Sequence, residues 1–226
     1  MTTSLPIETR SEATYRRSLA TRDAAWPIAI ARSLARFGMT PNAVSMLGVA
    51  FAFAAAAALA YSTAPVAVPA TATLLIAAGC IQLRLLCNLL DGMLAVEMGL
   101  KTPTGELFND LPDRIADVVI LVGAGYAVRD QPYGLALGWS AAVLALLTAY
   151  VRVLGGSLGL TQHFIGPMAK QHRMFTLTIA TLLSAVETVL AMPLRAMRVG
   201  LALIVVGSIA TACRRTRRIV KEVEAR

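Results

Sequence analysis

The sequence predicts an all-α membrane protein with six transmembrane helices and an amphipathic helix near the N-terminus that lies in the membrane interface. The first observation is composition: of 226 residues, 57% are hydrophobic and 15% are charged, whereas soluble domains average about 45–50% apolar and about 25% charged residues. The second is a succession of six apolar stretches, and the third is the grouping of basic residues on one side of them. This composition excludes a soluble globular domain, a disordered chain and a disulfide scaffold.

The N-terminal region, residues 1–42, is predicted to be a cytoplasmic tail followed by the interfacial helix. Between Ile28 and Phe37, apolar side chains follow one helical face and arginines the other, with Gly38 suited to end the helix. Such a helix lies at the membrane surface with its arginines near the lipid headgroups. An ordinary surface helix is the alternative.

The membrane domain is predicted over residues 43–213. Thr40 and Pro41 are suited to the N-cap and the first position of its first helix. The third apolar stretch is short and begins in an acidic segment, and Arg84 interrupts the second. The six stretches lie near residues 43–62, 66–90, 114–128, 133–155, 174–192 and 196–213.

The basic residues predict the orientation of the chain in the cell membrane. Of the 21 Lys and Arg residues, 16 lie in the two terminal tails and the even-numbered connections, and three lie on the other side. Since basic loops stay cytoplasmic, both termini are predicted to be cytoplasmic, including a basic tail over residues 214–226. The net charge of +8 then indicates anionic lipid as a partner, and no nucleic acid.

An acidic segment follows the second apolar stretch, with six of the 13 acidic residues in the 27 positions from Asp91 to Asp117. Asn88 and Asp91 are three residues apart and Asn109 and Asp113 are four apart, so each pair shares a helix face. Two antiparallel helices would point these four oxygen-bearing side chains at one another. Converging oxygen ligands suit a hard cation such as Mg²⁺ or Mn²⁺.

Residues 88–113 resemble the signature of the CDP-alcohol phosphotransferase family, Asp-x2-Asp-Gly-x2-Ala-Arg-x8-Gly-x3-Asp-x3-Asp. The spacing agrees across all 26 positions, and Thr-Pro-Asn at residues 40–42 resembles the tripeptide that often precedes the family's first span. Five positions also agree in identity: Asp91, Gly92, Ala95, Gly105 and Asp113.

The resemblance implies transfer of a substituted phosphate from a CDP-linked lipid, such as CDP-diacylglycerol, to an alcohol acceptor, with release of CMP. Asp113 would be the base that deprotonates the acceptor, and a homodimer is implied. Metal ligands would come from Asn88, Asp91, Asn109 and Asp113. The CDP-lipid or the acceptor would be bound near Gly92, Ala95, Gly105, Arg84, Arg152, Lys170 and Arg173.

Three signature positions differ from the family. Asn88 and Asn109 replace aspartates and Val96 replaces arginine, so the formal charge of the four aspartate positions falls from −4 to −2. Fewer anionic ligands weaken divalent binding, so we expect one or two ions held more weakly than in the family, the second mainly by substrate phosphates, or no ion. Asp110 points about 100° away from Asn109 around a helix and does not simply replace it.

Arg84 lies one helical turn before Asn88, inside the second apolar stretch. An arginine at the centre of a membrane helix costs about 2.5–3.5 kcal/mol on insertion scales, so a partner is expected. We predict that Arg84 pairs with Asp117 or reaches toward Asp91. It would then supply phosphate-binding charge missing at Val96, or else mark an inactive site; snorkelling to the interface is the alternative.

Two functions remain open from the sequence. The intact spacing with Asp91 and Asp113 indicates an active transferase of phospholipid synthesis. The loss of two aspartates and one arginine is compatible with a non-catalytic relative that binds CDP-lipid or nucleotide, or assists another membrane enzyme. Unrelated small membrane proteins, including transporters, share only the number of spans.

Overall fold

The computed structural model describes residues 25–64, 68–100, 103–160 and 165–226, and within these ranges it is all-helical. The all-α prediction is therefore confirmed for this part of the chain, while residues 1–24 of the predicted tail lie outside it. The helices are α2 (Ala25–Arg36), α3 (Pro41–Tyr61), α4 (Ala70–Val96), α5 (Gly105–Ala127), α6 (Gly134–Ser157), α7 (Lys170–Val189) and α8 (Arg195–Glu224).

The predicted boundary between α2 and α3 is confirmed. The Thr40 hydroxyl accepts a hydrogen bond from the Ala43 amide at 3.2 Å, with Pro41 as the first residue of α3. Gly38 has a φ of +74°, which glycine adopts without the steric cost that a side chain would impose. Its amide donates to the Ala35 carbonyl at 3.0 Å, so α2 ends where the sequence predicted.

Three helices extend well beyond the apolar stretches that predicted them: α5 begins early, at Gly105, and α4 and α8 end late. α4 runs through Gly92 and continues to Val96, and the chain turns at Gly99, whose φ is +67°. Asn88 and Asp91 are therefore inside a helix and not at the edge of a loop. α8 continues to Glu224, so most of residues 214–226 is helical; its place as a cytoplasmic tail stays a prediction.

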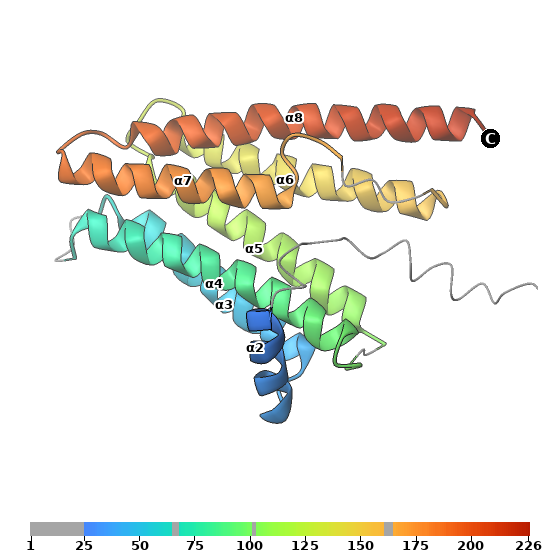
Figure 1. Ribbon diagram of the computed structural model, residues 1–226. Coiled ribbons are helices and arrows are strands. Elements are labelled where there is room, and N and C mark those ends of the chain that lie inside the picture. The colour runs from blue at the N-terminus through green and yellow to red at the C-terminus, as the bar shows by residue number, and fades with distance from the viewer. Residues whose placement is uncertain (1–24, 65–67, 101–102, 161–164) are drawn as a thin grey trace, which may run out of the picture.

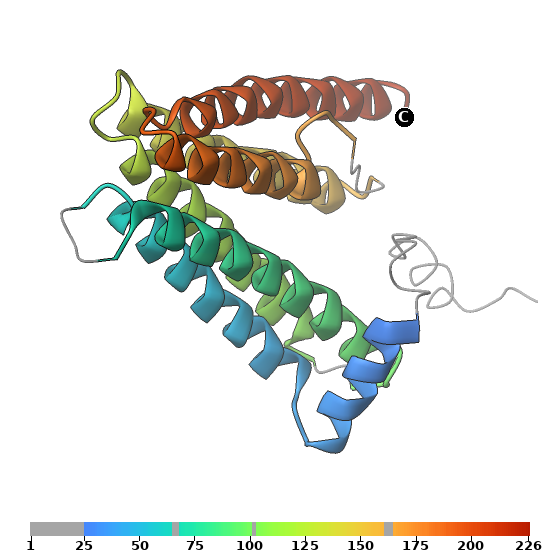
Figure 2. The same cartoon turned by 60° about the vertical axis from the view of Figure 1, so that its left-hand side comes forward.

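The long helices form two layers (Figures 1 and 2). α3, α4 and α5 pack together in one layer, and α6, α7 and α8 in the other. α5 packs against both α3 and α6, while α4 packs against α7, so these helices join the layers. α2 lies across the end of the first layer and packs against α4.

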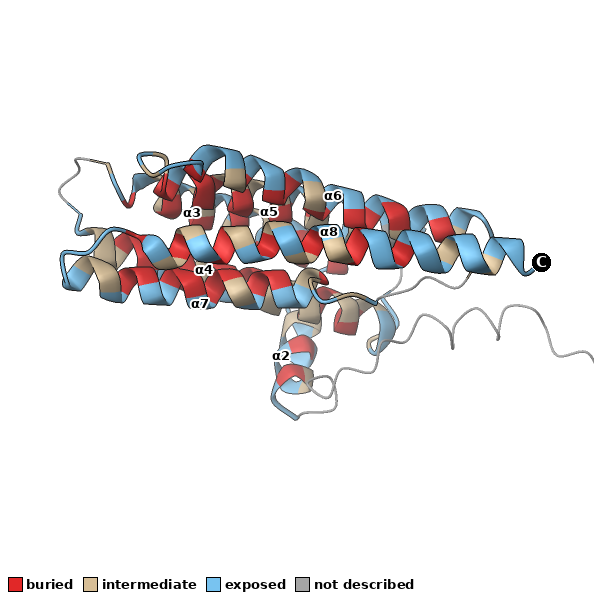
Figure 3. Ribbon diagram, turned by 90° about the horizontal axis from the view of Figure 1, so that it is seen from above, coloured by how far each residue is buried: buried red, intermediate tan, exposed pale blue. Residues whose placement is uncertain are grey.

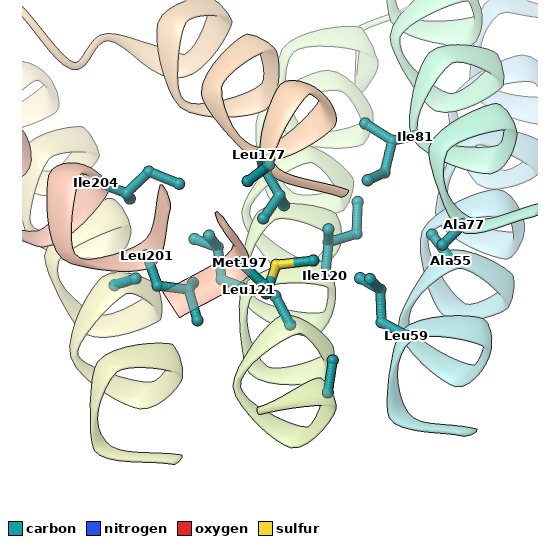
Figure 4. Packing of buried hydrophobic residues seen from close by; sticks show 14 of the residues in the cluster. Ala55, Leu59, Ala77, Ile81, Ile120, Leu121, Leu177, Met197, Leu201 and Ile204 are labelled. Atoms are coloured by element: carbon teal, nitrogen blue, oxygen red, sulfur yellow. The ribbon is translucent and has the colours of Figure 1, made fainter. Parts of the chain in front are cut away.

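Much of the interior of the bundle is an apolar core, in which side chains from both layers pack against one another (Figure 4). Leu59, Ile120 and Leu201 are completely buried there. Large apolar side chains are also exposed, among them Phe53 at 54% and Val206 at 67%. Buried and exposed residues alternate along the long helices (Figure 3). Apolar residues on both the inner and the outer surface are typical of helices in lipid.

Four helices are long and apolar enough to cross a membrane: α3, α4, α6 and α8. α5 and α7 are not among them, and they carry buried charged residues such as Asp117 and Arg173. Four of the six predicted spans therefore have the length and composition of a membrane-crossing helix, and the number of spans stays a prediction.

α5 and α6 approach closely at two glycines. A methyl group added at Gly138 would lie 2.6 Å from the Gly125 Cα atom, closer than real side chains come to backbone. Glycine at both positions therefore permits the contact, as expected for small residues between membrane helices. By contrast, a methyl group at Gly79, on the exposed face of α4, would meet nothing within 4 Å.

We predict that Gly138→Ala lowers the melting temperature of the purified protein, because α5 and α6 must move apart. Overpacking typically costs about 1–3 kcal/mol, which corresponds to at least about 2 °C for a protein of this size. Thermal unfolding in detergent measures the change. Gly79→Ala is the matched control and should leave the melting temperature unchanged or slightly raised; an equal fall in both variants would contradict the close-packing argument.

Candidate functional site

The four oxygen-bearing side chains predicted to converge do so. Asn88 on α4 donates from Nδ2 to Asn109 Oδ1 at 3.4 Å and to Asp113 Oδ2 at 3.3 Å, both on α5. Asp91, one turn after Asn88, lines the same pocket as these three residues. The 26-residue motif therefore folds back on itself as two facing helices, and its oxygens surround one space.

Only one of the two carboxylate oxygens of Asp91 has a hydrogen-bond partner. Its Oδ2 accepts a hydrogen bond from the Ser45 hydroxyl of α3 at 2.6 Å. Its Oδ1 is buried and has no hydrogen-bond partner, although the side chain is only 5% exposed. A buried carboxylate oxygen without a partner is costly, and a cation in the pocket would satisfy it.

Arg84 lies beneath the motif and is 2% exposed. Its Nη2 donates to Asp117 Oδ1 at 2.8 Å, so the predicted pairing with Asp117 is confirmed. The same nitrogen donates to Asp113 Oδ1 at 3.2 Å and to the Asp113 carbonyl at 3.1 Å. Arg84 therefore ties α4 to two successive turns of α5.

Arg173 completes the buried network from α7. Its Nη2 donates to Asp117 Oδ2 at 3.1 Å, and its Nη1 donates to Thr148 Oγ1 and to the Met168 carbonyl, both at 3.1 Å. Arg173 and Asp117 are each only 2% exposed. Asp117 is thus bridged by an arginine on each carboxylate oxygen.

Lys170, at the start of α7, points into the motif. Its ammonium donates to Asn88 Oδ1 at 2.7 Å and forms an ion pair with Asp113 Oδ2. Three carboxylates (Asp91, Asp113 and Asp117) then stand among three cations (Arg84, Lys170 and Arg173). The formal charge of these six side chains is zero.

Arg152 and Asp110 form a separate group. Arg152 Nη2 donates to both oxygens of Asp110, at 3.2 and 3.1 Å. Arg114 donates to the same carboxylate at 3.1 Å from one turn along α5. Asp110 therefore does not replace Asn109 in the motif, as its position around the helix predicted.

The remaining signature positions lie along the ends of the two motif helices. Gly92 and Ala95 are half-buried within α4, and Gly105 is the half-buried first residue of α5. Val96, where the family has arginine, is 47% exposed at the end of α4. No group of three or more His, Cys, Asp or Glu side chains gathers at metal-binding distance anywhere in the described ranges, so amide oxygens would have to complete any divalent site.

Three residues in or near the site were missed by sequence reasoning. Ser45 holds Asp91 from α3, and Gly48 lies one turn further along the same lining face; a serine and a glycine three apart in an apolar stretch could have indicated a polar contact. Arg215, which the sequence placed in the basic tail, is 6% exposed and donates to the Thr148 carbonyl at 2.6 Å. Nothing in its local sequence separates it from the neighbouring arginines.

Removing Arg84 should destabilise the protein strongly, because Asp117 would keep only one of its two buried partners. Breaking a buried pair costs about 3–5 kcal/mol, and we expect Arg84→Gln to lose that much in denaturant unfolding in detergent. The matched control is Arg218→Gln, since Arg218 makes an exposed pair with Glu222 and such pairs contribute about 1 kcal/mol or less. Equal losses in the two variants would contradict the network.

The chain shares its fold with solved structures of one enzyme. No protein-family model and no curated protein sequence matches the chain. Three solved structures of Mycobacterium tuberculosis phosphatidylinositol phosphate synthase do match. The structure with CDP-DAG bound has a TM-score of 0.73 and 24% identity, covering 87% of this chain and 94% of that one.

The other two structures of the synthase agree. The complex with manganese and citrate has a TM-score of 0.71 and 23% identity, covering 85% of this chain and 88% of that one. The apo form has a TM-score of 0.69 and 24% identity, covering 84% and 93%. The chain therefore has the fold of a CDP-alcohol phosphotransferase family member, as the motif resemblance implied.

Proposed function

We propose that the protein transfers a phosphatidyl-type group from a CDP-linked lipid, such as CDP-diacylglycerol, to an alcohol acceptor and releases CMP. The observation that carries the proposal is the convergence of Asn88, Asp91, Asn109 and Asp113 around one pocket. These are the four signature positions, and they meet in a fold shared with a synthase solved with CDP-DAG bound.

Asp113 is the residue proposed to accept the proton of the acceptor hydroxyl. The freed oxygen attacks the phosphorus that carries the lipid alcohol, the bond from that phosphorus to the CMP oxygen breaks, and CMP leaves with the electron pair. Arg84 holds Asp113 Oδ1 at 3.2 Å, which fixes the carboxylate. Asp113 Oδ2 becomes available when Lys170 turns to a substrate phosphate, an alternative anionic partner for its ammonium.

A divalent metal fits the pocket on chemical grounds. The oxygens of Asn88, Asp91, Asn109 and Asp113 suit Mg²⁺ or Mn²⁺, and Asp91 Oδ1 is buried without a partner. The related synthase was crystallised with manganese. When bound, such an ion would offset charge on the pyrophosphate during transfer.

The test is CMP release by the purified protein. CDP-diacylglycerol would be supplied with Mg²⁺ or Mn²⁺ and a panel of phosphorylated and unphosphorylated alcohols. We expect Asp113→Asn to reduce the rate by about 10²–10⁴, the usual contribution of a general base. Asp130→Asn is the control, because Asp130 is 79% exposed and lies in the turn after α5, beyond the end of that helix opposite to the motif; an unaffected Asp113→Asn variant would refute the assignment.

A second candidate function is CDP-lipid binding without turnover. One observation favours it: Asp113 is already engaged by Arg84 on Oδ1 and by Lys170 and Asn88 on Oδ2. Saturable binding of CDP-diacylglycerol with no CMP release from any acceptor would support this candidate. CMP release with one acceptor would reject it.

We infer that all six long helices cross the cell membrane, with both termini cytoplasmic. α5 and α7 pack within the layers formed by the four apolar helices, and their buried charged residues Asp117 and Arg173 pair with each other inside the bundle. Fusion reporters test this: green fluorescent protein after Arg226 should fluoresce, and alkaline phosphatase inserted at Tyr133, between α5 and α6, should be active. The reverse pattern would overturn the orientation.

A further inference from the structure

The Lys170 ammonium contacts two of the four signature positions that were predicted to bind metal. Its ammonium donates to Asn88 Oδ1 at 2.7 Å and pairs with Asp113 Oδ2. Asn88 and Asp113 are the first and last of the four signature positions. Lys170 is 18% exposed and Asp113 15%, so the pair lies inside the site and not on a surface where water would screen it.

The carboxylate in this half of the site already has more than one positive partner. Asp113 is contacted by the ammonium of Lys170 and the guanidinium of Arg84, while Asn88 contributes no charge. A divalent ion placed beside Asp113 would meet two positive groups at close range and one carboxylate shared between them. Repulsion at that distance is large in a partly buried site, so this half disfavours a metal.

The other half of the site is open to a cation. Asp91 is 5% exposed, its Oδ2 is held by Ser45, and its Oδ1 lines the pocket without a partner. No cationic side chain among the described residues makes an ion pair or hydrogen bond with Asp91. A cation in the pocket would therefore satisfy Asp91, whereas Asp113 is already paired with Arg84 and Lys170.

We propose that the Lys170 ammonium is a built-in cation that replaces one of two metal ions, so that the protein binds a single divalent ion, at Asp91. The two asparagine substitutions and Lys170 are then one adaptation, because removing carboxylates and adding an ammonium both lower the demand for metal charge. The inference rests on the proposed function only in treating the motif as a cation site.

The experiment is titration of the full-length protein in detergent with Mn²⁺, following free Mn²⁺ by electron paramagnetic resonance. We expect one Mn²⁺ per chain in the unmodified protein. In Lys170→Met the dissociation constant should fall at least tenfold, because a neighbouring positive charge is removed. Lys221→Met, on the exposed end of α8, is the matched control and should bind like the unmodified protein.

Two further variants separate the ammonium from the number of carboxylates. Asn88→Asp alone should still bind one Mn²⁺, because Lys170 pairs with the new carboxylate. Asn88→Asp combined with Lys170→Met should bind two. Lys170→Arg keeps the positive charge and should bind one, which keeps the inference testable if Lys170→Met fails to fold.

Two Mn²⁺ ions, or none, in the unmodified protein would overturn the inference, as would a single ion in the combined variant. The number of bound Mn²⁺ ions is measured without turnover. A protein that binds one Mn²⁺ but releases no CMP would retain the cation inference and lose the proposed transferase activity, whereas CMP release with two bound ions would do the opposite.

Discussion

The arrangement of the site depends on one buried carboxylate. Asp117 on α5 receives Arg84 of α4 on one oxygen and Arg173 of α7 on the other, and all three side chains are 2% exposed. Charges removed from water are tolerated only when they are paired with good geometry. α4, α5 and α7 belong to two different layers, so this one residue fixes how the layers meet at the site.

The chemistry of the motif follows from that junction. Arg84 reaches from Asp117 to Asp113 one turn earlier on α5, and Lys170 lies one turn before Arg173 on α7. The helical repeat therefore presents a second pair of charges directly above the first. The Asp117–Arg173 pair joins the helices. The Asp113–Lys170 pair faces the pocket, where Asp91 Oδ1 has no hydrogen-bond partner.

The same network accounts for the uneven hydropathy of the helices. α5 carries Asp113 and Asp117 of the network and α7 carries Lys170 and Arg173, and these two helices fall short of the apolar composition of α3, α4, α6 and α8. Every charged contact of Asp117 is made inside the bundle, where lipid does not reach it. In membrane proteins such residues are expected to face the interior and to mark function, and here they support the candidate site.

The sequence alone determined features that depend on neighbours along one helix or on composition. These include the all-helical fold, the Thr40 cap, the shared faces of Asn88 with Asp91 and Asn109 with Asp113, and the need of Arg84 for a partner. Each rests on a helical repeat or on the cost of an unpaired charge in an apolar stretch. The motif spacing also predicted the fold that the solved structures share.

Only the tertiary structure decided which distant side chains meet. Several contacts join helices that are far apart in the chain: the Ser45–Asp91 hydrogen bond and the contacts of Lys170 with Asn88 and Asp113. Arg215 is likewise buried only because other helices cover it. A helix face can be computed from spacing, but the rotation of one helix against another is set by packing between them. Lys170 could have faced lipid headgroups or the motif, and only the docking of α7 against α4 placed its ammonium among the metal-ligand positions.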